Sequence, residues 1–169
     1  MHQPAGDQQL VQLVNATLAE AFRLAGRWLA CKPGCTECCI GPFPITPMDA
    51  ARLRRGLAEL DRADPPRAER VRRRANREVA LTAPGFPGDP ATGIFNGEEE
   101  AEEAFATRWE TLPCPALDPD TGRCDLYPWR PISCRTFGPP VQIGAELLPP
   151  SITPRPNRTG RGSPPKSSA

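Results

Sequence analysis

Hydrophobic residues recur every three or four positions near the start of the chain, which is the spacing of one face of an α-helix. In residues 8–30 these positions are Val11, Val14, Leu18, Phe22, Ala25 and Leu29. The spacing predicts a helix over residues 8–30 whose apolar face packs against the rest of the protein. We expect packing, rather than contact with a cofactor, to be the role of its aromatic side chains.

A second helix is predicted to begin after Thr46. Thr46 is a typical N-cap residue, Pro47 suits the first helical position, and the carboxylate of Asp49 falls in the first turn. The apolar positions of this helix are Met48, Leu53, Leu57 and Leu60. The sequence Asp-Pro-Pro at 64–66 ends it, because proline disfavours helical backbone in the residue before it.

The same periodicity predicts a third helix over residues 66–81. Its buried positions are predicted to be Ala68, Val71, Ala75 and Val79. Six arginines are predicted to face solvent: Arg67, Arg70, Arg72, Arg73, Arg74 and Arg77. Such a surface could grip phosphates, but Glu69 and Glu78 are close by, and charge runs of this kind usually form a solvated face. We therefore favour a solvated face over a nucleic-acid surface.

The segment 84–97 is so rich in proline and glycine that we expect a long loop without regular structure. An acidic helix is predicted next, with glutamates at 98–100, 102 and 103, and it continues through Phe105 and Trp109. Carboxylates in a first turn favour the helix dipole, and their spacing lacks the glycine and alternating ligands of a calcium loop. We expect the arginine-rich helix to be the neighbour of these glutamates.

Composition limits the class of protein. Only 38% of the 169 residues are hydrophobic and 23 are proline, so the core is modest and much of the chain is loop. The net charge is +1, but residues 151–169 carry four positive charges and no acid, so residues 1–150 carry −3 and give no reason to expect a nucleic-acid surface. The N-terminus lacks the features of a signal peptide, and no apolar run is long enough to span a membrane. We therefore expect a cytoplasmic protein that does not associate with membranes.

Seven cysteines in a cytoplasmic protein indicate metal binding more than disulfides, because thiols stay reduced there. Four of them form a first cysteine block at residues 31–39: Cys31, Cys35, Cys38 and Cys39. Their spacing matches neither the paired Cys-x2-Cys motifs of common zinc sites nor the cysteine run of bacterial ferredoxins. Cys38 and Cys39 are adjacent, and neighbouring side chains diverge in extended backbone. A polynuclear cluster, or two sites, should therefore hold them better than one tetrahedral ion.

A second cysteine block, residues 114–134, contains Cys114, Cys124 and Cys134 at even spacing. The sequence Asp-Pro-Asp-Thr-Gly at 118–122 is strong turn chemistry between the first two of these thiols. It predicts a small cysteine knuckle. Pro131 suits the first position of a short helix that carries Cys134.

All seven thiols are therefore candidate metal ligands, and a metal is expected to bring the two blocks together. Arg130 and Arg135 flank Cys134, where guanidinium groups could offset the negative charge of metal-bound thiolates. The single histidine, His2, lies near the chain terminus and is not expected to be a ligand.

Together the two blocks resemble the YkgJ-type cysteine-cluster family, which is described as a zinc- or iron-chelating domain. The resemblance rests on Cys-x3-Cys-x2-Cys-Cys at 31–39 and on Cys-Pro-x-Leu at 114–117. These are followed by Thr-Gly-x-Cys-x-Leu-Tyr at 121–127 and Arg-Pro-x-x-Cys-Arg-x-Phe at 130–137. The resemblance covers about residues 31–140. It implies a metal or iron–sulfur site and a distant relationship to the cluster-bearing flagellin lysine methylases, without a settled activity.

We expect a metal-binding protein that holds an iron–sulfur cluster, with [4Fe–4S] preferred, or zinc. Its role would be redox chemistry, metal handling, or assistance to another enzyme or protein partner. Two alternatives stay open: a cluster-dependent, methylase-like enzyme that modifies protein side chains, and a zinc module that binds nucleic acid through the arginine-rich helix. The sequence contains no Gly-rich nucleotide loop and no Ser-His-Asp set, so binding is favoured over catalysis.

The expected fold is mainly α and irregular. It is a small, metal-stapled domain of three or four helices with long Pro/Gly loops and a cysteine knuckle, and we assign it to residues 1–150. Residues 151–169 are rich in proline, arginine and serine and are expected to form a disordered tail.

Overall fold

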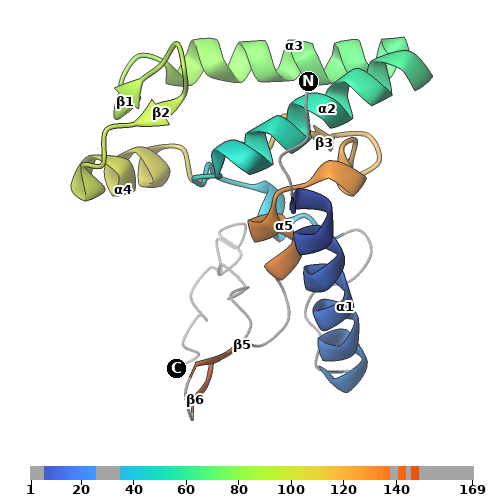
Figure 1. Ribbon diagram of the computed structural model, residues 1–169. Coiled ribbons are helices and arrows are strands. Elements are labelled where there is room, and N and C mark those ends of the chain that lie inside the picture. Colours follow the sequence, from blue (N-terminus) through green and yellow to red (C-terminus); the bar gives the residue numbers. More distant parts are fainter. Residues whose placement is uncertain (1–5, 26–34, 138–140, 144–145, 149–169) are drawn as a thin grey trace, which may run out of the picture.

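The computed structural model describes residues 6–25, 35–137, 141–143 and 146–148. This part of the chain is mainly helical with little strand (Figure 1), which confirms the predicted fold class. The helices are α1 (Asp7–Ala25), α2 (Pro47–Ala63), α3 (Pro65–Thr82), α4 (Glu99–Arg108) and α5 (Ile132–Thr136). Short 3-10 turns lie at η2 (Glu37–Cys39) and η3 (Tyr127–Trp129). The predicted tail, residues 151–169, and the end of the first predicted helix, residues 26–30, lie outside the described residues.

Helices α2 and α3 pack against each other as a hairpin without a linker. Asp64 ends α2 by donating its N–H to the carbonyl of Leu60, and its side chain then caps α3 by accepting from the N–H of Arg67. At the other end of α2, Thr46 and Asp49 form a capping box in which each side chain accepts from the other's N–H. The predicted start and end of α2 are therefore confirmed.

The core lies between this hairpin and the second cysteine block. Its buried members are Leu60, Ala68, Val71, Ala116 and Leu126. Leu53, Leu57, Cys114, Cys124 and Trp129 pack against them and are partly buried. Val79 was predicted to be buried, but its side chain is 57% exposed. That prediction is wrong because the buried residues of α3, Ala68 and Val71, lie in its first half, and the helix continues from there toward the β1–β2 pair (Figure 1).

The proline- and glycine-rich segment contains a small antiparallel pair, β1 (Gly88–Asp89) with β2 (Ile94–Phe95), where no regular structure was predicted. The pair packs on α4 through an aromatic group. Phe86 contacts Phe95 at 4.9 Å between ring centroids and Phe105 at 5.5 Å. This group holds the segment in place and lies apart from the core residues named above.

Two further hairpins follow in the chain. β3 (Leu117–Asp118) pairs with β4 (Arg123–Cys124) inside the second cysteine block. β5 (Val141–Ile143) pairs with β6 (Glu146–Leu148) beyond it. In the described residues, no helix combines the length and the apolar character needed to cross a membrane.

Candidate metal centre

A short backbone bridge joins the two cysteine blocks. The N–H of Cys114 donates to the carbonyl of Cys39 at 2.7 Å, and the N–H of Gly41 donates to the carbonyl of Leu112 at 2.7 Å. Ile40 and Pro113 form the isolated β-bridge between these two bonds. Residues separated by more than seventy positions in the sequence are thus adjacent in space, as the sequence led us to expect.

Cys38 and Cys39 lie in the 3-10 turn η2, which is closed by a bond from the N–H of Cys39 to the carbonyl of Thr36. The backbone there is not extended, so the two neighbouring side chains do not diverge. A hydrogen bond with the Cys38 thiol raises the pKa of Cys39, and burial and the nearby Cys114 and Cys124 raise it further. The steric argument against binding of one ion by both Cys38 and Cys39 assumed extended backbone, and it therefore does not apply here.

The thiols of the second block are half-buried and lie within electrostatic reach of the first block. Burial raises the pKa of Cys134 to about 12, with further contributions from Cys114, Cys38 and Cys124. Burial also raises the pKa of Cys124 to about 11, and Cys114 adds to this effect. Five thiols, one pair from the first block and three from the second, thus oppose one another's ionisation. A bound cation would reverse this preference, and its binding would release protons.

Backbone N–H groups point at two of these sulfurs. The pKa of Cys114 is raised, chiefly by burial, but the N–H groups of Ala116 and Leu117 act in the opposite direction. The N–H of Leu126 acts in the same way on the pKa of Cys124. Hydrogen bonds of this kind favour the thiolate, which is the form that binds metals.

The predicted knuckle is the β3–β4 hairpin. Leu117 pairs with Cys124 and Asp118 pairs with Arg123. The Asp118 carboxylate accepts from the N–H of Asp120 and the hydroxyl of Thr121. Gly122 has a φ of 65°, a left-handed conformation that favours glycine. The turn chemistry read from the sequence is therefore confirmed.

The two arginines beside Cys134 differ in role. Arg130 stacks on the Tyr127 ring at 3.7 Å, and its charge acts to lower the pKa of Cys134, in line with the predicted electrostatic role. The guanidinium of Arg135 is instead buried and donates to the carbonyls of Arg130 and Pro128 and to the side chain of Asn15. Arg135 thus joins α5 to α1 and is committed to structure.

Pro131 was predicted to be the first helical residue, but it occupies the N-cap of α5, and Ile132 is the first residue of the helix. Pro131 has no side-chain hydrogen bond that could cap the helix. The helix is nevertheless formed around Cys134, as predicted, and its first N–H finds a partner on α2, described below.

Two arginines predicted to face solvent turn toward the second block instead. Arg67 and Arg74 bind the buried carboxylate of Asp125 at 2.5 and 2.6 Å. Arg74 also donates to the carbonyl of Pro115 at 2.8 Å. We call Asp125, Arg67 and Arg74 the Asp125 network; it fixes the residue that follows Cys124 to α3.

The ion pairs of this helix also correct the neighbour that we expected for it. Arg72 pairs with Asp61 at 2.7 Å, and the remaining pairs of the helix are to Glu69 and Asp125. Within the described ranges, none of its arginines forms an ion pair with the glutamates at 98–103. The acidic helix was therefore not the partner. Arg67 and Arg74, committed to Asp125, are less able to bind a phosphate backbone.

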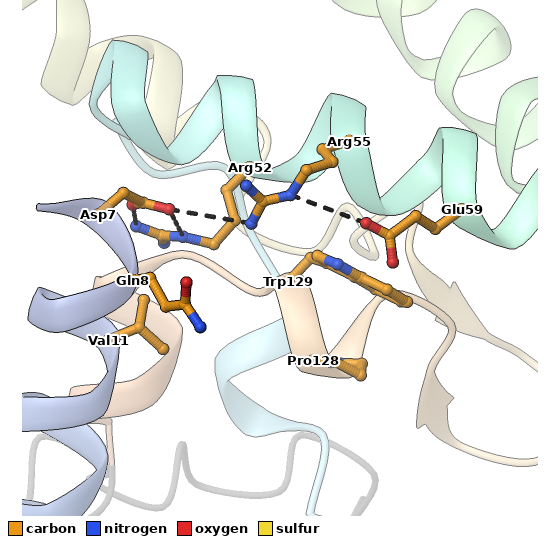
Figure 2. A pocket seen from close by; sticks show the side chains of 8 residues that line it. All are labelled: Asp7, Gln8, Val11, Arg52, Arg55, Glu59, Pro128 and Trp129. Carbon is orange, nitrogen blue, oxygen red and sulfur yellow. Dashed lines mark hydrogen bonds and ion pairs between the residues drawn. The ribbon is translucent and has the colours of Figure 1, made fainter. Parts of the chain in front are cut away.

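A second buried group, the Asp49 network, consists of Asp49, Arg52 and Asp7. The guanidinium of Arg52 binds both carboxylates (Figure 2 shows the pair with Asp7), and all three side chains are almost completely buried. It also donates to the carbonyl of Arg130 at 3.4 Å. The sequence identified Asp49 only as a first-turn acid. The contact of Asp49 with the Cys134 segment and the contact of Arg52 with α1 had no local signal.

An open cavity of about 320 Å³ lies beside the Asp49 network. Its lining residues are Asp7, Gln8, Val11, Arg52, Arg55, Glu59, Pro128 and Trp129. Figure 2 shows the charged side chains along α2 and the indole of Trp129 facing them. None of the described cysteines lines this cavity, so it is separate from the thiols that the structure places in the candidate metal centre.

The structure places six of the seven predicted ligands. Cys31 lies outside the described residues, and Cys35, Cys38, Cys39, Cys114, Cys124 and Cys134 are all half-buried free thiols. As they stand, no three His, Cys, Asp or Glu side chains in the described residues are arranged to hold one ion. The ligand set therefore stays a prediction.

The donor chemistry nevertheless fits a thiophilic metal, because buried sulfurs dominate the region where the blocks meet. Next to Cys134, the hydroxyl of Ser133 is buried and has no hydrogen-bond partner among the described residues. A hydroxyl in this position suits a sulfur-rich site, since it can donate to a thiolate or a sulfide.

Comparison with known proteins identifies the region. The family CxxCxxCC, described as "Putative zinc- or iron-chelating domain", matches residues 30–146. The chain belongs to this family. The match contains both cysteine blocks of the CxxCxxCC domain and the α2–α3 hairpin between them. It confirms the resemblance drawn from the cysteine spacing and supports a metal-binding role. No curated protein and no solved structure matches the chain.

Proposed function

We propose that the two cysteine blocks supply one shared thiolate metal centre. The observation that carries this proposal is the bridge that places Cys39 beside Cys114. The mutual effects of the thiols on their pKa values support it, since they connect Cys38 and Cys39 with all three cysteines of the second block. The protein would serve in metal handling, redox chemistry or assistance to a partner protein.

The proposed ligands come from the seven cysteines named above, of which Cys31 and Cys35 precede the η2 turn. An iron–sulfur cluster bound there would supply electron transfer, whereas zinc would supply a structural link between the blocks. The residues of the chain would hold the thiolates in place through N–H groups at Ala116, Leu117 and Leu126. The η2 turn removes the steric argument against a single ion, so both an iron–sulfur cluster and zinc are candidates for this centre.

Anaerobic purification followed by metal analysis and visible absorption spectroscopy tests the proposal. Iron and sulfide with broad visible absorption would support a cluster. Stoichiometric zinc without visible absorption would support a zinc centre. Absence of both metals from protein expressed in medium containing both would contradict the proposal.

Single substitutions test whether the centre is shared. Cys39→Ser and Cys114→Ser remove one thiol from each block, and each should lose the metal if both blocks contribute. Thr136→Ser, a conservative change at an exposed position of α5, is the matched control and should keep it. Full metal content in both cysteine variants would contradict a centre that depends on the thiols at the bridge, Cys39 and Cys114.

A further inference from the structure

Cys134 lies on α5, a helix that is too short to be stable without contacts to the rest of the protein. α5 has five residues, and its N-cap is a proline without a side-chain hydrogen bond. Isolated helices of this length do not form in water, because nucleation costs more than one turn returns. The position of Cys134 must therefore be set by groups outside α5.

The carboxylate of Asp49, on α2, supplies the missing partner. One of its oxygens accepts from the N–H of Ile132, the first residue of α5, at 3.0 Å. The same oxygen accepts from Arg52 at 2.6 Å. Asp49 thus does for α5, from another helix, what an N-cap side chain does within its own helix.

Arg52 fixes the chain on the other side of Pro131. Its guanidinium donates to the carbonyl of Arg130, so the two residues that flank the buried Pro131 are bound to neighbouring positions of α2. Both attachments lie within four residues of Cys134. The side chains that make them are 2% and 6% exposed, so water competes little for these bonds.

The same carboxylate also begins α2. The second oxygen of Asp49 accepts from the hydroxyl of Thr46 at 2.8 Å and from its N–H at 3.3 Å. The start of α2 and the start of α5 are therefore fixed by one side chain, which leaves it little freedom to move.

We propose that Asp49 and Arg52 are positioning residues for Cys134, which set the place of this thiol at the metal centre without contacting the metal. This inference rests on the proposed function. It extends that function to two residues that lie 82 or more positions before Cys134 in the chain and contain no sulfur.

The test is a double-mutant cycle on the affinity of the full chain for zinc, measured by competition with a chromophoric chelator. Asp49→Ala should weaken zinc binding about 10- to 100-fold, the usual cost of removing a group that orients a ligand. In a Cys134→Ser background the same substitution should have almost no further effect. Asp61→Asn is the matched control, because this half-exposed residue of the same helix has Arg72 as its one ion-pair partner among the described residues, and it should leave the affinity unchanged.

Cobalt(II) in place of zinc gives a second readout. Its charge-transfer absorption reports the thiolates bound, and it should fall by the contribution of one thiolate in Asp49→Ala and by the same amount in Cys134→Ser. Asp49→Asn keeps an acceptor for the Ile132 N–H, so it should partly restore both affinity and absorption. If Asp49→Ala does not fold, as judged by circular dichroism of the metal-free protein, Asp49→Asn takes its place in the cycle.

The outcomes separate the two proposals. Wild-type protein without stoichiometric zinc or cobalt binding would overturn the proposed function. Tight binding by the wild type with unchanged affinity in the Asp49 variants would overturn the positioning role alone. An equal fold-loss with and without Cys134 would also overturn it, because the effect would then not pass through this thiol.

Discussion

The two cysteine blocks are attached to the protein in different ways. The described part of the first block is held by backbone bonds, namely the η2 turn and the bridge from Cys39 and Gly41 to the second block. The second block is bound to α2 and α3 by buried side-chain charges, at Asp49 and at Asp125. The second block is therefore built into the fold, whereas the first is attached to it over a short stretch. We therefore expect a bound metal to stabilise the conformation of the first block more than that of the second.

Metal removal is the strongest way to test this comparison. After chelation, amide hydrogen exchange should accelerate most at residues 36–41, because few contacts hold them. The N–H of Asp125, bound to the carbonyl of Ala116, should keep its protection. Hydrogen exchange measured by mass spectrometry checks this, and equal loss of protection in both blocks would contradict it.

Removing the carboxylate of Asp125 should break the scaffold of the second block. Asp125→Ala leaves Arg67 and Arg74 without their shared partner, and we expect a loss of about 3 kcal/mol in the free energy of unfolding. Urea denaturation of the metal-free protein measures it. Asp120→Ala, in the exposed hairpin turn, should change stability by less than about 0.5 kcal/mol. Similar stabilities for the two variants would show that the network does not anchor the block.

The contact between α2 and Trp129 can be tested by crowding it. A Cβ on the buried Gly56 would overlap the Trp129 indole, so Gly56→Ala should destabilise the protein by about 1–3 kcal/mol. Combined with Trp129→Ala, the same substitution should instead be neutral or stabilising, since alanine favours a helix over glycine by about 1 kcal/mol. Denaturant midpoints of the four proteins measure the effect. A penalty that persists without the indole would place the clash elsewhere.

The smallest expected effect is the pH dependence that Asp49 gives to the attachment of α5. Burial acts to raise the pKa of Asp49, but hydrogen bonds from Ile132, Thr46 and Arg52 outweigh it and hold the pKa below its ordinary 3.8. A carboxyl of this kind adds stability above its unfolded pKa, and this stability is lost as the pH falls through the folded value. Asp49→Asn should therefore lose less stability than the wild type between about pH 5 and pH 2. Identical slopes in the two proteins would exclude this contribution.

Local patterns predicted the helices and the hairpin of the site well. Thr46 and Asp49 define the start of α2, and the turn at 118–122 defines the β3–β4 hairpin. Such features depend on residues a few positions apart, so their chemistry is visible in the sequence. The adjacency of Cys39 and Cys114 followed from the expectation of one shared metal.

The buried networks could not be predicted, because their partners are distant in the sequence. Arg52 meets Asp7 over 45 positions and Arg74 meets Asp125 over 51. A charged residue in a run of arginines has the same local signature whether it faces solvent or a buried carboxylate. The direction of the Arg67 and Arg74 side chains depends on where the second cysteine block packs. The hydrophobic pattern of α3 does not show this.

The single-residue connection at Asp64 fixes the rotation of α3 about its axis relative to α2. α2 carries the side chains that fix Cys134, and α3 carries those that fix Cys124, so the angular offset between the two helices becomes the offset between two thiols. One residue inserted after Asp64 would advance the start of α3 by about 100° and 1.5 Å along its axis. The two guanidinium groups would then turn away from Asp125. The length of the α2–α3 connection thus determines how the Cys124 and Cys134 segments lie relative to each other, although Asp64 lies at the far end of α2 from Asp49.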